Sequence, residues 1–551
     1  MNPHIDLAST LPNWQTALLM GPVLASCAAA IFAELPANTL SAWRAARWAA
    51  LASIVFSALL LATVLSGTHG TGLGLRADAL GAVLLMLVSF VGWVIVRYSQ
   101  PYLNGEHNER HYVRWLMATL ATVGLVVVTN NVLVLASAWT ATSLALHRLL
   151  TFFGERPAAV VAAHKKFIVA RLADVFMLLA AGLLYLAFGT LQIDQIIRLA
   201  SNSPQMPLAA QAAILLIASA ALLKCAQLPF HGWLIQVMEA PTPVSALLHA
   251  GVVNLGGFVL MRFAPLVTEV PAAQVLLVVA GTATAVLAAL VMTTRISIKV
   301  MLAWSTCAQM GFMLMQCGLG AWEMALLHLV AHSLYKAHAF LGAGGAVRRA
   351  MLVQLTPRAP SPGLLALLLG VLLGTGMMLA AGAAWSLLAP AQSTAPTLWV
   401  LASIVALALV PLVHAQAWRL GGLWLPALGL GAFCVALAYV GLHALFATWL
   451  LPNASAASGS PASLDLLWIG VALAFAGLFV LQSLLAVSPH GLLARRLYPW
   501  FYGGLFLDEK FNRIAFALWR PPGAASAKAP LPGADNSLAM DPTTPLSGAR
   551  T

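Results

Sequence analysis

Apolar segments long enough to cross a lipid bilayer recur along nearly the whole of this chain. A membrane-spanning helix needs about 20 apolar residues, and runs of this length extend from residue 17 to residue 487. Inside a bilayer the backbone has to satisfy its own hydrogen bonds, so such runs fold as helices. The sequence therefore predicts an all-α polytopic membrane protein. We count about fifteen segments, near 17–34, 46–66, 78–97, 113–129, 131–152, 167–188, 209–229, 243–262, 272–293, 300–319, 323–346, 363–387, 397–416, 422–450 and 465–487.

Composition excludes a soluble enzyme. Hydrophobic residues make up 61% of the chain, only 8% of residues are charged, and the mean hydropathy is +0.90. A soluble chain would carry about a quarter charged residues. The five cysteines are scattered through apolar segments without paired spacing, so we expect buried small hydrophobes and neither a metal site nor another cofactor.

The net charge of +12 is explained by membrane topology rather than by nucleic-acid binding. Basic residues gather in alternate loops, as the positive-inside rule predicts. The pattern places the N-terminus outside and the C-terminus in the cytoplasm, and we expect the membrane to be a bacterial inner membrane. Loops after odd-numbered segments hold Arg44, Arg47, Arg97, Arg110, Arg114, Arg148, Arg156, Lys165, Lys166, Arg295, Lys299, Arg348, Arg349, Arg358 and Arg419, whereas the others hold Arg76, Arg198 and Arg262.

Three regions follow from these patterns. Residues 1–487 are expected to form the helical bundle, with a short interfacial helix within 189–205. Residues 488–520 become amphipathic and aromatic, which suits a cytoplasmic helix lying on the membrane or on a partner. Residues 521–551 are rich in Pro, Ala, Gly and Ser, and we expect disorder there.

Lys224 lies inside the apolar stretch 212–229 and is the first candidate for function. An ionisable residue in the bilayer core is costly and usually marks an ion or proton path. The alternative is a lysine that reaches the interface along its own helix. On the preceding segment, Arg171 and Asp174 share a helix face. Asp174 either pairs with Lys224 across the helix interface or forms a local ion pair with Arg171.

Prolines predict an interrupted helix next to this lysine. Pro229 follows Lys224 closely, and Pro241 and Pro243 open the next segment. Glycines at 342, 344 and 345 weaken the end of a later segment. Interrupted helices in two parts of a membrane chain are typical of transporters built from inverted repeats.

His328, His332 and Lys336 recur every four residues and line one face of a helix. They would span about 12 Å of membrane depth. Histidine exchanges protons near neutral pH, so the row is a candidate proton path. Metal ligation and structural hydrogen bonding are the alternatives. His249 could connect this row to Lys224, and Lys299 either joins the path or anchors its helix at the interface.

These residues resemble the antiporter-type proton-translocating subunits, the family of the large membrane-arm subunits of respiratory complex I and of the Mrp cation/proton antiporters. The resemblance covers about residues 76–350. It implies two inverted five-helix repeats in a core of residues 76–416, with Lys224 as the central lysine of a half-channel. His249, Lys299, His328, His332 and Lys336 would continue its polar axis. The matching motifs are 171–176 (RLADVF), 224–229 (KCAQLP), 241–250 (PTPVSALLHA), 298–306 (IKVMLAWST) and 328–337 (HLVAHSLYKA).

Three departures narrow the resemblance. Family members carry a Trp-Glu pair on the fifth helix, whereas this chain has Trp139 followed by Thr140. The long members have a second central lysine, but no lysine occurs here between Lys336 and Lys510. Only residues 488–551 follow the last span, which is too short for a long lateral helix and a terminal span.

The shortened DabB-type subunits of inorganic-carbon accumulation complexes fit these departures. This resemblance implies a non-catalytic coupling subunit that conducts protons, or Na⁺, and drives CO2 hydration in a large zinc-bearing DabA-like partner. The alternatives are a proton-pumping subunit of a respiratory or hydrogenase-type complex, a Na⁺/H⁺ antiporter subunit, and a scaffold with a vestigial polar axis. The expected path runs through Asp174, Lys224, His249, His328, His332 and Lys336.

Overall fold

The bundle is built from helices that follow one another through short connections. The computed structural model describes residues 11–35, 38–345, 348, 351–352, 364–388, 401–402, 404–407, 425–449 and 462–518. The predicted disordered tail and most of the expected span 397–416 lie outside these residues.

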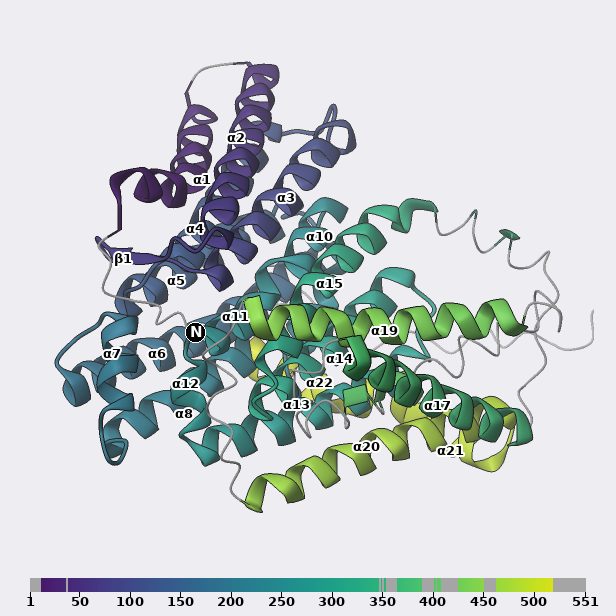
Figure 1. Ribbon diagram of the computed structural model, residues 1–551. Coiled ribbons are helices and arrows are strands. Elements are labelled where there is room, and N and C mark those ends of the chain that lie inside the picture. The colour runs from purple at the N-terminus through teal and green to yellow at the C-terminus, as the bar shows by residue number, and fades with distance from the viewer. Residues whose placement is uncertain are drawn as a thin grey trace, which may run out of the picture.

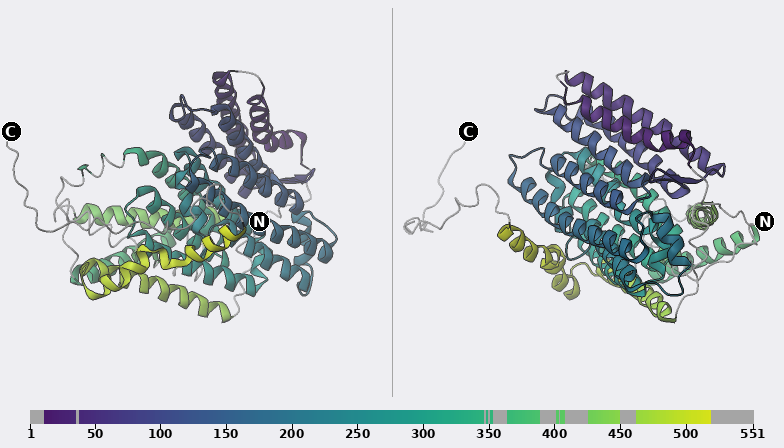
Figure 2. Two further views of the ribbon diagram at one scale, coloured as in Figure 1. Left: turned by 180° about the vertical axis from the view of Figure 1, so that it is seen from behind. Right: turned by 90° about the vertical axis from the view of Figure 1, so that its left-hand side faces the viewer.

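The N-terminal helices form a layer at one end of the molecule, drawn in purple to blue in Figure 1. These are α1 (Asn13–Phe32), α2 (Thr39–Leu65), α3 (Ala79–Tyr102), α4 (Glu109–Val128) and α5 (Val132–Leu150). Helix α1 packs against α2 and α4, and α5 joins the layer to the centre. The second view of Figure 2 shows the purple helices as a separate layer beside the rest.

A two-stranded hairpin, which the sequence pattern did not predict, lies between α2 and α3. Strands β1 (Gly70–Gly72) and β2 (Leu75–Ala77) pair antiparallel around Leu73 and Gly74. Both turn residues have positive φ, 52° and 73°, which is the geometry of the tight turns that suit the twist of a hairpin.

The central helices carry the interruption predicted from the prolines. Helix α6 (Pro157–Phe188) and the short α7 (Ile193–Ser201) precede α8 (Leu208–Lys224), which ends at Lys224 rather than continuing to Pro229. The chain then passes through α9 (Gly232–Gln236), η1 (Val237–Glu239), α10 (Thr242–Ala250), η2 (Val252–Asn254) and α11 (Leu255–Arg262). The segment after Lys224 is therefore a series of short helices, as expected of a broken transporter helix.

The placement of Lys165 and Lys166 corrects the sequence interpretation. The loop assignment was wrong, because both residues lie within α6 and are buried. A cluster of cations interrupts the apolar run at this point, so hydropathy alone placed the start of the helix too late. Both side chains instead find hydrogen-bond partners inside the protein.

The next helices bring the histidine row against the broken segment. Helix α12 (Ala264–Thr268) leads to α13 (Pro271–Met292), α14 (Ile298–Gly318), α15 (Trp322–Leu341) and η3 (Gly342–Gly345). Helices α13 and α14 approach closely where Gly281 faces Gly311. A Cβ on either glycine would lie 2.6 Å from the other's carbonyl oxygen, so only glycine permits this contact.

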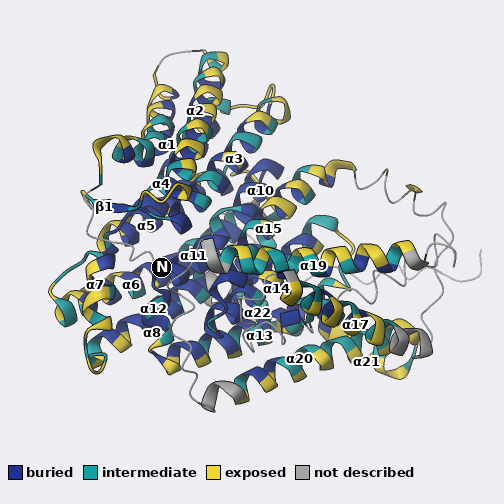
Figure 3. Cartoon of the chain, viewed as in Figure 1, coloured by how far each residue is buried: buried dark blue, intermediate teal, exposed yellow. Residues whose placement is uncertain are grey.

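The C-terminal helices return to the central bundle. Helices α17 (Leu364–Leu388), α19 (Leu425–Trp449) and α20 (Ala462–Val487) lie on the side away from the N-terminal layer (Figure 1). Helix α21 (Leu492–Tyr502), η6 (Gly504–Phe506) and α22 (Leu507–Leu518) then run back to α6, α9 and α13. Buried residues concentrate in the central helices, whereas α17 and α20 expose much of their surface (Figure 3).

The chain is a multi-pass membrane protein. Among the described residues, 12 helices are long and apolar enough to cross a membrane. The expected number of about fifteen is not confirmed. Helix α8 has only 17 residues, and the histidine-bearing α15 is not among the 12.

Candidate functional site

The central feature is an ion network around Lys224, the last residue of α8. Lys224 Nζ lies 2.7 Å from Asp174 Oδ1, and Arg171 Nη2 lies 2.8 Å from Asp174 Oδ2. The Lys224 and Asp174 side chains are only 9% and 8% exposed, whereas Arg171 is 30% exposed. Both alternatives drawn from the sequence therefore coexist, because one carboxylate uses its two oxygens for two cations.

A small cavity adjoins this network. It has a volume of about 20 Å³ and is lined by residues that include Trp139, Thr142, Ser143, Lys166 and Lys224. A cavity needs about 10–15 Å³ to hold one water, and the lining supplies polar partners for it. The Lys224 ammonium also lies over the Trp139 ring, 4.8 Å from its centroid.

Lys224 is held at the break because α8 ends at this residue and the chain continues as short helices. Pro241 caps α10, and Pro243 falls in the first turn of that helix, where the missing N–H costs no hydrogen bond. Just beyond α10, Asn254 Nδ2 of η2 donates to Ala250 O at 3.1 Å and to Ser333 Oγ at 2.7 Å. The second bond ties the broken segment to α15.

On α10, Leu248 lines the Lys224 cavity, and the next residue, His249, contacts α15. It is fully buried on α10 and stacks on Phe340 of α15, with ring centroids 4.4 Å apart. Among the described residues, neither of its ring nitrogens has a hydrogen-bond partner. A buried imidazole without partners is costly, so a water or a change of conformation has to satisfy it.

The row on α15 is buried at its inner end. Lys336 is fully buried and donates to Leu302 O at 3.0 Å and to Ser305 Oγ at 2.8 Å, both on α14. The rings of His328 and His332 lie 5.9 Å apart, and His328 also packs on Phe312. The predicted face is therefore continuous from His328 to Lys336.

Lys299 lies at the start of α14 and contacts the start of α10. Its Nζ donates to Thr242 Oγ1 at 2.9 Å. The contact joins two helix ends at the break.

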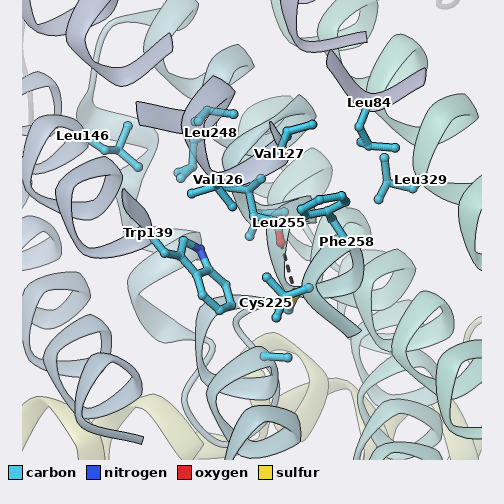
Figure 4. Packing of buried hydrophobic residues seen from close by; sticks show 14 of the residues in the cluster. Leu84, Val126, Val127, Trp139, Leu146, Cys225, Leu248, Leu255, Phe258 and Leu329 are labelled. Atoms are coloured by element: carbon cyan, nitrogen blue, oxygen red, sulfur yellow. Dashed lines mark hydrogen bonds between the residues drawn. The ribbon is translucent and has the colours of Figure 1, made fainter. Parts of the chain in front are cut away.

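Apolar side chains surround these polar groups. Figure 4 shows Leu255 and Phe258 near Cys225, with Trp139 and Leu248 in the same cluster, and the Cys225 thiol donates to Val253 O at 3.1 Å. Such a lining excludes bulk water, so any transfer of ions has to use the side chains and a few enclosed waters.

Comparison with known proteins places the chain in a family. Residues 129–359 match the model described as "NADH:quinone oxidoreductase/Mrp antiporter, TM", and residues 64–115 match "NADH-Ubiquinone oxidoreductase (complex I), chain 5 N-terminus". The chain is 43% identical to the "Probable inorganic carbon transporter subunit DabB" of Hydrogenovibrio crunogenus over 82% of this chain and 84% of the relative. It is 38% identical to DabB2 of Halothiobacillus neapolitanus over 82% of this chain and 83% of that relative.

This chain belongs to the DabB family. The antiporter-type fold also has a solved relative, the Mrp complex from Dietzia sp., with a TM-score of 0.55 and 26% identity over 91% of this chain and 55% of that chain. The resemblance drawn from the motifs is thereby confirmed. The DabB relatives are named as transporter subunits, and this agrees with the expectation that the chain is a membrane transport protein.

Several polar residues of this DabB family member escaped the sequence interpretation. Lys166 lines the Lys224 cavity, and its position among other cations hid it. Glu323 on α15 and His443 on α19 approach to 3.8 Å. Nothing in the spacing connects residues so far apart, and only the fold brings them together. Among the described residues, no three His, Cys, Asp or Glu residues gather as a metal site.

A second ion network holds α3 to α11. The buried Arg262 pairs with Asp78, the residue that caps α3, and donates to Val127 O at 3.0 Å. Burial opposes ionisation of Asp78, but Arg262, Arg76 and the Gly81 amide together hold the pKa of its carboxyl below the ordinary value. Arg262 is thus a structural residue rather than a loop cation.

Proposed function

We propose that this chain is the proton-conducting membrane subunit of an energy-coupled inorganic-carbon accumulation complex. Protons move along Asp174, Lys224, His249, His328, His332 and Lys336, with Lys299 at the margin of the path. The ion gradient drives CO2 hydration in a large zinc-containing DabA-like partner on the cytoplasmic side. The chain itself is not an enzyme.

The observation that carries this proposal is the Lys224–Asp174 pair beside a water-sized cavity at a broken helix. A buried ion pair is a costly way to stabilise a fold, because removing two charges from water offsets much of their attraction. A lysine can release and recapture a proton, which an arginine cannot. Similarity to DabB over more than four fifths of both chains supports the carbon substrate.

The test is inorganic-carbon uptake in cells that depend on this chain and its partner. Lys224→Ala and Lys224→Arg should each lower uptake at least tenfold, because neither side chain can exchange the proton. Arg495→Ala, which removes an exposed cation on α21, is the matched control and should keep normal uptake. Normal uptake in Lys224→Ala would remove this lysine from the mechanism.

The second candidate is a proton-pumping subunit of a redox complex, or a Na⁺/H⁺ antiporter subunit. The redox candidate is favoured by the chain's 34% identity, over 50% of its length, to "NADH-quinone oxidoreductase subunit L" of Mycobacterium tuberculosis. Purification of the tagged chain distinguishes the candidates. One zinc-containing partner supports the carbon complex, whereas a quinone-reducing assembly supports the redox complex. Rescue of salt-sensitive growth by the chain would support the antiporter.

A further inference from the structure

Lys166 is a buried cation that the path described above does not use. Its side chain is 4% exposed, and it lies on α6 in the middle of the molecule. Its Nζ donates to Ser143 O at 2.6 Å and to Ser143 Oγ at 2.8 Å, and both acceptors are neutral. A buried ammonium held only by neutral oxygens is a poor structural tether, because a glutamine or serine would join α5 to α6 without desolvating a charge.

The position of Lys166 relates it directly to Lys224. Both lysines line the same cavity of about 20 Å³, together with Ser143 and Thr142. On α6, Lys166, Ala170 and Asp174 follow at four-residue spacing and so share one face. Lys166 lies about 12 Å along the helix from Asp174, toward the end of α6 that the charge pattern assigns to the cytoplasm. Asp174 and Lys166 therefore flank Lys224 along α6.

Ser143 can satisfy Lys166 in both protonation states. When the lysine is an ammonium, the Ser143 carbonyl and hydroxyl oxygens both accept hydrogen bonds from it. When the lysine is a neutral amine, the hydroxyl can turn and donate to the nitrogen lone pair, while the carbonyl still accepts an N–H. The site therefore suits a residue that changes charge.

We propose that Lys166 is a second proton-carrying lysine, which exchanges a proton with Lys224 through one water in the shared cavity. The inference rests on the proposed function and adds the cytoplasmic side of its path. One N–H bond of the Lys224 ammonium breaks as its proton passes to the water oxygen. Another water proton forms an N–H bond with the neutral Lys166 amine. One proton moves, the water is regenerated, and nothing is oxidised or reduced.

This proposal also gives a physical account of Thr140. A glutamate at that position in relatives would hold a proton on the central lysine by attraction. Here a second lysine faces the same cavity, and two ammonium groups there would repel each other, which disfavours the doubly protonated pair. The two lysines therefore share one proton: Asp174 holds it on Lys224 in the resting state, and Lys166 is then neutral and able to accept it.

The experiment measures proton flux of the full chain with its partner in proteoliposomes at several pH values. Lys166→Gln can keep a hydrogen bond to Ser143 but cannot titrate, and Lys166→Arg keeps the charge but does not release a proton. We expect both variants to lower flux at least tenfold with unchanged thermal unfolding. The pH profile of the residual flux in Lys166→Gln should also change, because only one of the two coupled lysines is left to titrate. Ser143→Ala, which preserves helix propensity, should lower flux severalfold and change the pH profile.

A structural tether predicts a different result. Wild-type flux in Lys166→Gln or Lys166→Arg, or a wild-type pH profile in Ser143→Ala, would overturn the proposal. If a Lys166 variant fails to reach the membrane, the Ser143→Ala profile decides alone. Lys224→Ala in the same assay distinguishes failure of the Lys166 proposal from failure of the proposed function. An inactive Lys224→Ala beside active Lys166 variants rejects only this inference, whereas an active Lys224→Ala rejects the proposed function.

Discussion

A single carboxylate, Asp174, organises the centre of the site. The sequence predicted that Asp174, Arg171 and Lys224 matter, but spacing could not decide between the two possible ion pairs. The spacing could not decide because a carboxylate has two oxygens. Only the fold shows that one oxygen of Asp174 faces Arg171 and the other faces Lys224. The sequence interpretation missed Lys166 for a related reason. Its sequence neighbours are cations typical of a loop, and only the fold shows that Ser143 accepts its hydrogen bonds and allows it to be buried.

Removing Asp174 should destabilise the protein more than removing its partner Arg171. Asp174→Asn leaves two cations without a counter-charge, one of them nearly fully buried, and should lower the free energy of unfolding by about 3 kcal/mol. Arg171→Gln should cost only about 1 kcal/mol, since that side chain is partly exposed. Thermal unfolding of the purified chain in detergent measures both. Equal losses for the two variants would contradict the shared-carboxylate arrangement.

At the scale of helices, the sequence predicted most spans and the break after Lys224 but not how the C-terminal segment docks. An amphipathic pattern identifies a surface helix without naming the surface it contacts. Asp508 of α22 pairs with the buried Lys165 at 2.6 Å and accepts from Gln236 Nε2 at 2.7 Å. Gly232 of α9 faces this carboxylate so closely that a Cβ would lie 1.5 Å from it. The contact thus joins α22 and α6 to α9, the first helix of the broken segment.

Breaking this contact should release the C-terminal helices. Asp508→Ala leaves the Lys165 ammonium buried without its carboxylate and should cost about 2 kcal/mol, less than a fully buried pair because Asp508 is 27% exposed. Limited proteolysis of the purified chain should then cut within residues 488–518 faster than in the wild type. Glu509→Ala, at the exposed neighbouring position, is the matched control. Equal cleavage rates in Asp508→Ala and Glu509→Ala would show that the contact does not hold the segment.

At the scale of the whole molecule, the side chains that line the polar path determine which ion it can conduct. The residues proposed to conduct are lysines and histidines with one carboxylate, and the cavity at their centre is lined by two lysines. Hard cations such as Na⁺ require several oxygen ligands, and nearby ammonium groups repel them. Titratable nitrogen bases carry protons without needing such a cage. The length and hydropathy of the helices could predict a transporter, whereas this choice requires knowing which side chains face one another.

Inorganic-carbon uptake should therefore depend on the proton gradient and not on sodium. In cells that express the chain with its partner, a protonophore should abolish uptake at any sodium concentration. Replacing external Na⁺ with choline should change uptake by less than twofold, because no step of the path binds the metal ion. Lys224→Ala provides the baseline for uptake that does not pass through the chain. Uptake that survives the protonophore but stops in choline medium would show that the path carries Na⁺, and the lysine-lined cavity would then have to open to admit oxygen ligands.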